Sequence, residues 1–204
     1  SNQVSSIDRK DYLLAASDLV EGLEELKRQE YYNRAFTLGN TPIVNEIEAV
    51  SSHPLGSFIR QGFSSPIGQQ AEGLYLAACL ADRDDQRIDV KKRIYELFGQ
   101  DENSSYRLVR ALQCLGESDF LNDDIGFLAG QDWGARSLAA ILWVKHPNPV
   151  YVGYRLAHDP DVRVRQSFAG ALAGCEETPE HVEVRELLSQ DPHYSVRKSL
   201  QKKK

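Results

Sequence analysis

Residues 156–174, LAHDPDVRVRQSFAGALAG, decide the expected fold of this chain. The stretch holds the end of one helix, an Asp-Pro turn, and the start of a second helix that carries Val-Arg followed by small apolar residues. The same skeleton returns at residues 187–200, LLSQDPHYSVRKSL. The two copies are offset by 32 residues, as shown by their turn aspartates and helix arginines, Asp159 and Asp191, Arg165 and Arg197. A repeated helix–turn–helix unit specifies architecture more than chemistry.

Helical pairs of this kind are expected from residue 86 onward, because apolar residues keep a helical spacing and no strand pattern appears. First helices are predicted over residues 87–98, 118–129, 149–157 and 179–189. Second helices are predicted over residues 104–116, 133–145, 162–174 and 194–202. Three of the starts carry an N-cap residue: Ser118, Asn148 and Thr178. Four pairs at a nearly constant period predict stacked units that bury their apolar sides against one another.

The first 69 residues are expected to form an N-terminal helical cap. Residues 6–39 predict one long amphipathic helix, and Thr41-Pro42 predicts the start of another. Residues 54–69 are rich in Pro and Gly, and Ser65-Pro66 predicts the next helix start. The predicted domains are a cap over residues 1–69 and a repeat array over residues 70–204, with one continuous domain as the alternative.

The repeated motif D-P-x-x-x-V-R-x-x-(A/L) resembles the HEAT-repeat family, in its short variant seen in phycobilisome-lyase-like repeats. The match covers about residues 86–204 and is looser at Asp132–Leu142, where Arg136 takes the arginine position. The resemblance implies an all-α, right-handed α-solenoid. In that family the turn aspartate and the second-helix arginine form a ladder between repeats. The resemblance therefore implies a structural role for Asp159, Arg165, Asp191 and Arg197.

Basic residues collect on the predicted second helices, which contain no Asp or Glu, whereas acidic residues collect on the first helices and turns. In HEAT-like solenoids the second helices line the concave surface, so the resemblance implies a basic concave face. The helical phase and the basic pattern predict these partner-binding residues: Arg107, Arg110, Trp133, Ser137, Arg163, Gln166 and Lys198. The alternative is that these cations only favour helix C-termini and complete the ladder.

These features favour a non-catalytic scaffold that binds a protein partner, expected to be an acidic segment, on the concave face. The competing class is a nucleic-acid-binding HEAT-like protein or a DNA glycosylase-type enzyme, because Asp132-Trp133 and Trp143 resemble the Trp and Asp of such enzymes. The alternative places both tryptophans in the core or at a hinge. No nucleotide-binding or acyl-transfer motif occurs, and the five histidines lack ligand spacing, so no catalytic residue, cofactor or metal is predicted.

The net charge, the cysteines and the length of the apolar runs bear on the class of partner and on the cellular location of the protein. A net charge of −6 argues against indiscriminate nucleic-acid binding over the whole surface. Three cysteines without paired spacing, Cys79, Cys114 and Cys175, favour buried reduced thiols in a cytoplasmic protein. The apolar runs are too short to cross a membrane. At the C-terminal end, Val196 and Leu200 form an apolar side, which predicts that a partner or another copy of the chain covers it, or that the native chain is longer.

Overall fold

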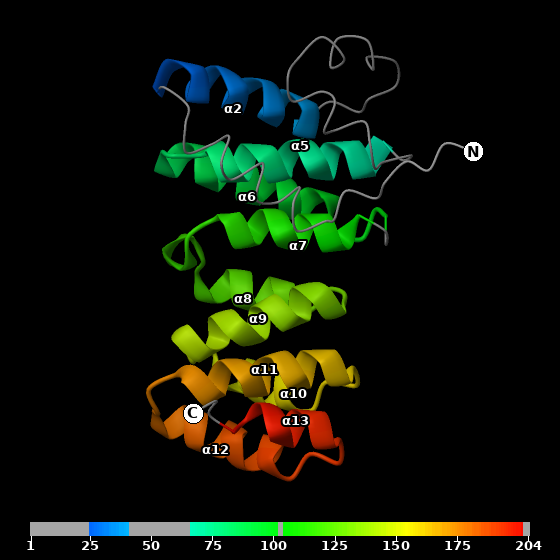
Figure 1. The fold of residues 1–204 in the computed structure, drawn as a ribbon, viewed down its shortest axis with the longest axis vertical. Helices are drawn as coiled ribbons and strands as arrows, with labels where there is room; N and C mark the ends of the chain where they lie inside the picture. The colour runs from blue at the N-terminus through cyan, green and yellow to red at the C-terminus, as the bar shows by residue number, and fades with distance from the viewer. Residues whose placement is uncertain (1–24, 41–65, 102–103, 202–204) are drawn as a thin grey trace, which may run out of the picture. The chain divides into compact units, whose positions relative to one another are not determined.

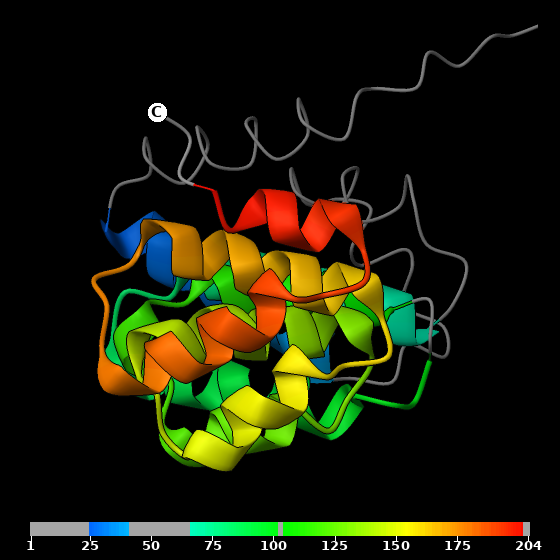
Figure 2. The same cartoon turned by 90° about the horizontal axis from the view of Figure 1, so that it is seen from below.

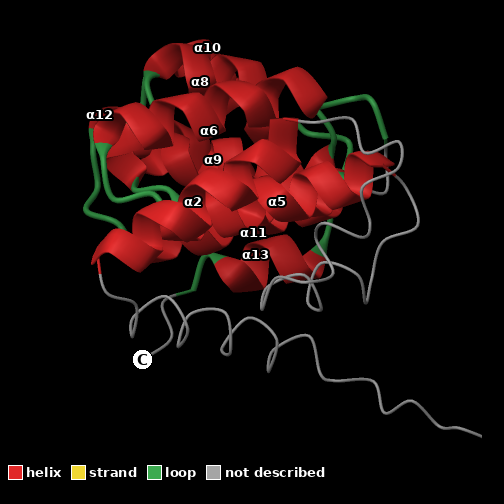
Figure 3. Ribbon diagram, turned by 90° about the horizontal axis from the view of Figure 1, so that it is seen from above, coloured by secondary structure: helices red, strands yellow, loops and turns green. Residues whose placement is uncertain are grey.

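The computed structural model describes residues 25–40, 66–101 and 104–201. Within these ranges the regular secondary structure consists of helices, without strands (Figure 3). The α-helices are α2 (Glu25–Asn40), α5 (Pro66–Leu80), α6 (Asp84–Leu97), α7 (Ser105–Cys114), α8 (Asn122–Leu128), α9 (Trp133–Lys145), α10 (Val150–Ala157), α11 (Val162–Gly174), α12 (Pro179–Ser189) and α13 (Tyr194–Ser199). The prediction of an all-α chain is confirmed for these residues. The chain divides into two compact units, Ser1–Leu115 and Gly116–Lys204, named here unit 1 and unit 2.

In unit 1, helix α5 packs against α2, α6 and α7 (Figure 1). Helices α2 and α5 approach closely at Gly73, where an added Cβ would lie 2.8 Å from the backbone nitrogen of Gly39 and 2.9 Å from the carbonyl oxygen of Ala35. Because α5 contacts both α2 and α7, the residues on either side of the predicted boundary at residue 69 belong to one unit. The division of the chain lies at Leu115 instead.

Gln86 joins α2 to the start of α6. Its buried side chain accepts a hydrogen bond from the backbone N–H of Asp82 (3.1 Å) and donates one to Gln29 on α2 (2.9 Å). The Tyr32 hydroxyl donates to the Gln86 carbonyl oxygen (3.3 Å), and burial, aided by nearby aspartates, raises the pKa of Tyr32 to about 12. Helix α6 consequently begins at Asp84, so the turn between α5 and α6 is short.

Unit 2 consists of three helical pairs, α8 with α9, α10 with α11, and α12 with α13. The second helices pack in the order α9, α11, α13, and α10 contacts α12 as well as α9 and α11. Figure 2 shows α13 (red) alongside α11 (orange). The helices predicted over residues 133–145 and 162–174 are confirmed at both ends.

The core of unit 2 is centred on Trp143, which is fully buried. Its ring packs edge-on against Phe168, with centroids 5.5 Å apart, and against His181, with centroids 5.8 Å apart. The indole Nε1 donates a hydrogen bond to the Pro149 carbonyl oxygen (3.0 Å). Gly153 on α10 leaves room for the ring, because a Cβ there would overlap with it. Trp143 is therefore a core residue.

The predicted helix starts are corrected at two of the three caps. Ser118 lies in a short 3₁₀ turn, Glu117–Asp119, and α8 begins only after Leu121, whose N–H donates to Asp124 Oδ2 (2.7 Å). The N-cap of α10 is Pro149, one residue after the predicted Asn148. The prediction was right at Thr178, which precedes Pro179 at the start of α12.

Several predictions fall partly or wholly outside the described residues. Helix α2 ends at Asn40, close to the predicted end of the helix over residues 6–39, but residues 1–24 and the helix expected after Thr41 are not described. Helix α13 ends at Ser199, earlier than the predicted residue 202. None of the described helices combines the length and apolar character needed to span a bilayer.

Candidate functional site

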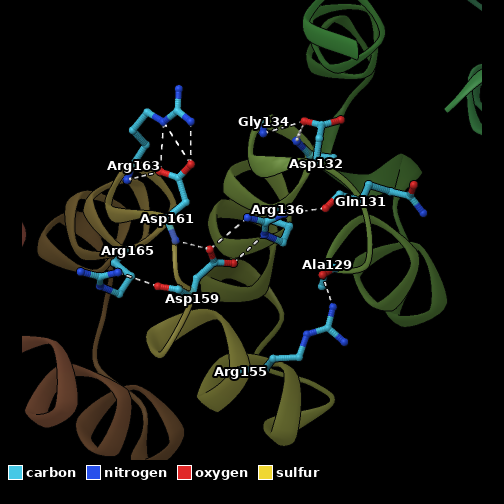
Figure 4. A network of polar contacts seen from close by, with 11 residues as sticks. Ala129, Gln131, Asp132, Gly134, Arg136, Arg155, Asp159, Asp161, Arg163 and Arg165 are labelled. Atoms are coloured by element: carbon cyan, nitrogen blue, oxygen red, sulfur yellow. Dashed lines mark hydrogen bonds and ion pairs between the residues drawn. The ribbon is translucent and has the colours of Figure 1, made fainter. Parts of the chain in front are cut away.

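A chain of arginine–aspartate pairs connects successive helical pairs of unit 2. Figure 4 shows the first of these pairs, Arg136 with Asp159. Arg136 on α9 donates from Nε and Nη2 to the two carboxylate oxygens of Asp159, at 2.6 and 3.1 Å. Arg165 on α11 does the same with Asp191, at 2.6 and 3.4 Å. Both carboxylates are buried, with side chains 4% exposed. We name this chain of contacts the arginine ladder.

The same residues also fold the turns that precede the second helices. Asp159 and Asp191 each accept a hydrogen bond from the backbone N–H two residues further on, at 2.9 and 2.8 Å. Arg165 Nη1 donates to the Asp159 carbonyl oxygen (2.6 Å), and Arg197 Nη1 donates to the Asp191 carbonyl oxygen. Arg165 and Arg197 thus each stabilise the turn that precedes their own helix, and Arg165 also binds Asp191 in the turn before α13. All four residues predicted to form a ladder take part in these contacts.

Hydrogen bonds within the arginine ladder favour the ionised form of the Asp191 carboxylate and of the Arg136 guanidinium. Burial by itself raises the pKa of Asp191, but hydrogen bonds from Arg165 and from the His193 N–H lower it overall. The hydrogen bond to Asp159 raises the pKa of Arg136. A buried ion pair with satisfied oxygens depends on both partners, because removing one leaves an uncompensated charge. This geometry suits a structural element more than a ligand site.

A second surface consists of exposed side chains on α9, α11 and α13, and we name it the second-helix face. Its residues are Trp133, Arg163, Gln166, Gly170, Tyr194 and Lys198. The Arg163 guanidinium lies over the Trp133 ring, 3.8 Å from its centroid, which is a cation–π contact between α9 and α11. Lys198 approaches the Tyr194 ring in the same way at 6.0 Å. Trp133 remains 38% exposed, so one side of the stack faces solvent.

Asp161 positions Arg163 and was missed by the sequence interpretation. It is the N-cap of α11, where it accepts the Arg163 backbone N–H (2.9 Å), and its carboxylate pairs with the Arg163 guanidinium at 2.6 Å. The hydrogen bonds from Arg163 lower the pKa of Asp161 to about 2. Because this carboxylate offsets the charge of Arg163, the face is less basic than the helix sequences alone indicate. An aspartate two residues before an arginine at a helix start was the available signal.

The predicted accessibility of Ser137 is wrong. This residue, expected among the partner-binding residues, is only 9% exposed. Helix α9 packs against α8, α10 and α11, so burial extends around much more of this helix than a single apolar stripe. The Ser137 hydroxyl has no hydrogen-bond partner among the described residues. A partner cannot reach Ser137 in this conformation.

Arg107 and Arg110, also predicted to bind a partner, lie on α7 in unit 1. Both are half-buried. Arg110 donates to the Gln113 side chain (2.9 Å), and its positive charge acts on the thiols of Cys79 and Cys114. Their predicted role in partner binding stays a prediction, because the second-helix face is defined here by helices of unit 2 alone.

The apolar side expected at the end of the repeats is largely covered within unit 2. Val196 is fully buried and Leu200 is half-buried. Helix α13, which carries Val196, packs against α11 and α12. The exposed apolar side chain on this helix is that of Tyr194.

Residues considered for catalysis have structural partners. Asp132 caps α9 by accepting the backbone N–H groups of Gly134 (2.8 Å) and Ala135 (3.3 Å). Cys175 lies 3.8 Å from His181 Nδ1, and two backbone groups are closer to that nitrogen: the Thr178 N–H at 3.2 Å and the Glu176 carbonyl oxygen at 3.1 Å.

Across the described parts of the chain, no group of three or more His, Cys, Asp or Glu side chains is arranged to hold a metal ion. Comparisons with protein-family models, curated proteins and solved structures give no match.

Proposed function

We propose that the chain is a non-catalytic, HEAT-like repeat scaffold that binds an acidic segment of a protein partner on the second-helix face. The arrangement within unit 2 supports the repeat interpretation, because α9, α11 and α13 pack in order and the arginine ladder recurs between them. Contacts that recur between neighbouring units are expected of stacked repeats. We extend the proposal to a right-handed solenoid.

The observation that carries the binding proposal is the stack of Arg163 on Trp133. An exposed indole held against a guanidinium by neighbouring repeats presents the two residue types most enriched in the energetic centres of protein interfaces. Asp161 also binds the Arg163 guanidinium through an ion pair, so the Arg163 side chain has little conformational entropy left to lose when a partner binds. The stack is thus preorganised as an anchor point.

The charges around the stack favour an acidic partner segment. Helices α9, α11 and α13 contain no Asp or Glu within their bounds, and Lys198 adds an exposed cation to the face. Acidic side chains of unit 2 lie on the other helices, including Asp123 on α8 and Glu183 on α12, and in the turns, where Asp161 pairs with Arg163. An acidic segment would be attracted to the second-helix face and repelled by α8 and α12.

Site-specific photo-cross-linking tests this proposal. A photoreactive amino acid at Gln166, which is exposed beside the stack, captures the partner in an extract of the native cell, and mass spectrometry identifies the segment attached. The affinity for that segment is then measured for Trp133→Ala, Arg163→Glu and Lys198→Glu. We expect Trp133→Ala and Arg163→Glu each to weaken binding by about 30-fold, the effect of a typical hot-spot residue, and Lys198→Glu to weaken it less.

Arg83→Glu is the matched control. Arg83 is exposed and pairs with Asp85 two residues away, as Arg163 pairs with Asp161, but it precedes α6 in unit 1. Its reversal should leave the affinity unchanged within about twofold. Unchanged affinity for all three face variants would refute the proposal. A salt-sensitive gel shift with short DNA duplexes, abolished by Arg163→Glu, would also refute it and favour nucleic-acid binding.

A further inference from the structure

Two cysteines that are far apart in sequence meet inside unit 1. Cys79 lies near the end of α5 and Cys114 at the end of α7, and the packing of α5 on α7 brings their Sγ atoms to 3.0 Å. Both thiols are free, Cys79 is half-buried and Cys114 is exposed. The sulfurs are within about 1 Å of bonding distance, so a small movement of the side chains suffices to join them.

We propose that Cys79 and Cys114 form an oxidant-reactive dithiol site, which hydrogen peroxide converts into an intramolecular disulfide that links α5 to α7. The site needs no third residue and no metal. Exposure of Cys114 opens the pair to solvent, and the contact of the two sulfurs places the second thiol where it resolves the first oxidation product.

The surroundings assign different roles to the two sulfurs. The side-chain contact with Cys114 lowers the pKa of Cys79, despite burial, and the hydrogen bond with Tyr75 and the charge of Arg110 act in the same direction. The same contact raises the pKa of Cys114. Cys79 is therefore the attacking thiolate and Cys114 the resolving thiol.

The reaction proceeds in two balanced steps. The Cys79 thiolate attacks one peroxide oxygen, so that an S–O bond forms, the O–O bond breaks, and the departing hydroxide takes a proton to become water. The sulfur of the resulting sulfenic acid is then attacked by Cys114, the S–S bond forms, and the S–O bond breaks with release of a second water that carries the Cys114 proton. Two electrons pass from the thiols to the peroxide, and an added dithiol reverses the oxidation by exchange.

Cys175 provides an internal reference for the test, because it lies in unit 2 and its thiol donates to the Leu172 carbonyl oxygen (3.3 Å). The reduced full-length chain is treated with hydrogen peroxide, and the remaining thiols are blocked with N-ethylmaleimide. We expect one label per chain instead of three, and a mass loss of about 2 Da before labelling. A digest without reductant should contain the peptide that joins Cys79 to Cys114, and dithiothreitol should restore three labels.

Two variants make the result decisive. Cys175→Ser should keep the linked peptide, and Cys79→Ser should lose it while its circular-dichroism melting curve stays close to that of the reduced wild type. The proposal is overturned if all three thiols remain reactive after peroxide, if Cys79 is oxidised to sulfinic acid while Cys114 stays free, or if the disulfide involves Cys175 or joins two chains. None of these outcomes depends on a binding partner.

Discussion

Arg165 on α11 binds both carboxylate oxygens of Asp191, a residue 26 positions further along the chain that folds the turn before α13. The same guanidinium also holds the Asp159 carbonyl oxygen in its own turn. One side chain therefore fixes two consecutive turns of unit 2. Since Asp191 is buried, the stability of this region depends on an ion pair with little access to water.

Removal of Arg165 should destabilise unit 2 strongly. Arg165→Ala leaves the buried Asp191 carboxylate without its partner, and we expect a loss of about 3–5 kcal/mol in the free energy of unfolding. Arg163→Ala is the control, because its side chain is 54% exposed and its pairing with Asp161 is screened by solvent, so the loss in the free energy of unfolding should be much smaller. Urea unfolding followed by circular dichroism compares them, and equal losses in both variants would contradict the structural role of the ladder.

Two glycines inside helices should respond oppositely to substitution by alanine. At Gly153 the added methyl group overlaps with the buried Trp143 ring, so Gly153→Ala should destabilise the chain by about 1–3 kcal/mol. At Gly170 nothing lies within 4 Å of the added Cβ, so Gly170→Ala should stabilise α11 by about 0.5–1 kcal/mol. Thermal melting of both variants checks this pair, and a stabilised Gly153→Ala would show that α10 does not pack on Trp143.

Acid should weaken the start of α11 in a defined pH range. The folded-state pKa of Asp161 is about 2, below its unfolded value of about 3.9, because Arg163 donates hydrogen bonds to the carboxylate. A lowered pKa means that this contribution to stability is complete above about pH 4 and is lost as the pH falls through about 2. Asp191 shifts in the same direction.

The variant Asp161→Asn isolates this effect, since asparagine keeps the helix cap and removes the charge. The difference in unfolding free energy between wild type and Asp161→Asn should shrink as the pH falls from about 4 to about 2. Titration of unfolding against pH measures it. A difference that stays constant over this range would mean that the Asp161–Arg163 pair adds nothing to stability.

If the proposed disulfide forms, it should stabilise unit 1. It would close a loop across a separation of 35 residues, which restricts the unfolded chain and is worth about 3–4 kcal/mol in the loop-entropy description. Urea unfolding of the oxidised and the reduced chain measures the change, and Cys79→Ser should show none. An oxidised chain that is less stable than the reduced one would indicate that the link distorts the packing of α5 on α7.

Local signals in the sequence predicted most helices of unit 2. Helices α9 and α11 begin and end where the sequence indicated, because their apolar runs are bounded by turn residues on both sides. The start of α8 was wrong, since Asp124 caps the helix from inside it and displaces the expected cap at Ser118. Alternative caps a few residues apart compete by small energies, and a sequence does not rank them.

The candidate sites depended on contacts between distant segments, which a single sequence does not contain. The repeat motif marked Arg165 and Asp191 as structural, but the partner of each arginine follows from how the helical pairs stack. Burial of Ser137 results from neighbours on several sides of α9. The meeting of Cys79 and Cys114 requires α5 to lie on α7, and cysteine spacing gave no sign of it.

The offset of the ladder has a consequence for protein engineering. Residues 160–191 begin just after one Asp-Pro junction aspartate and end on the next, and they contain Arg165 together with its acceptor Asp191. A second copy of this segment inserted after Asp191 would recreate the Asp-Pro junction and supply every new arginine with a carboxylate. Unit 2 can therefore be lengthened by one helical pair at the position after Asp191, without the design of a new contact.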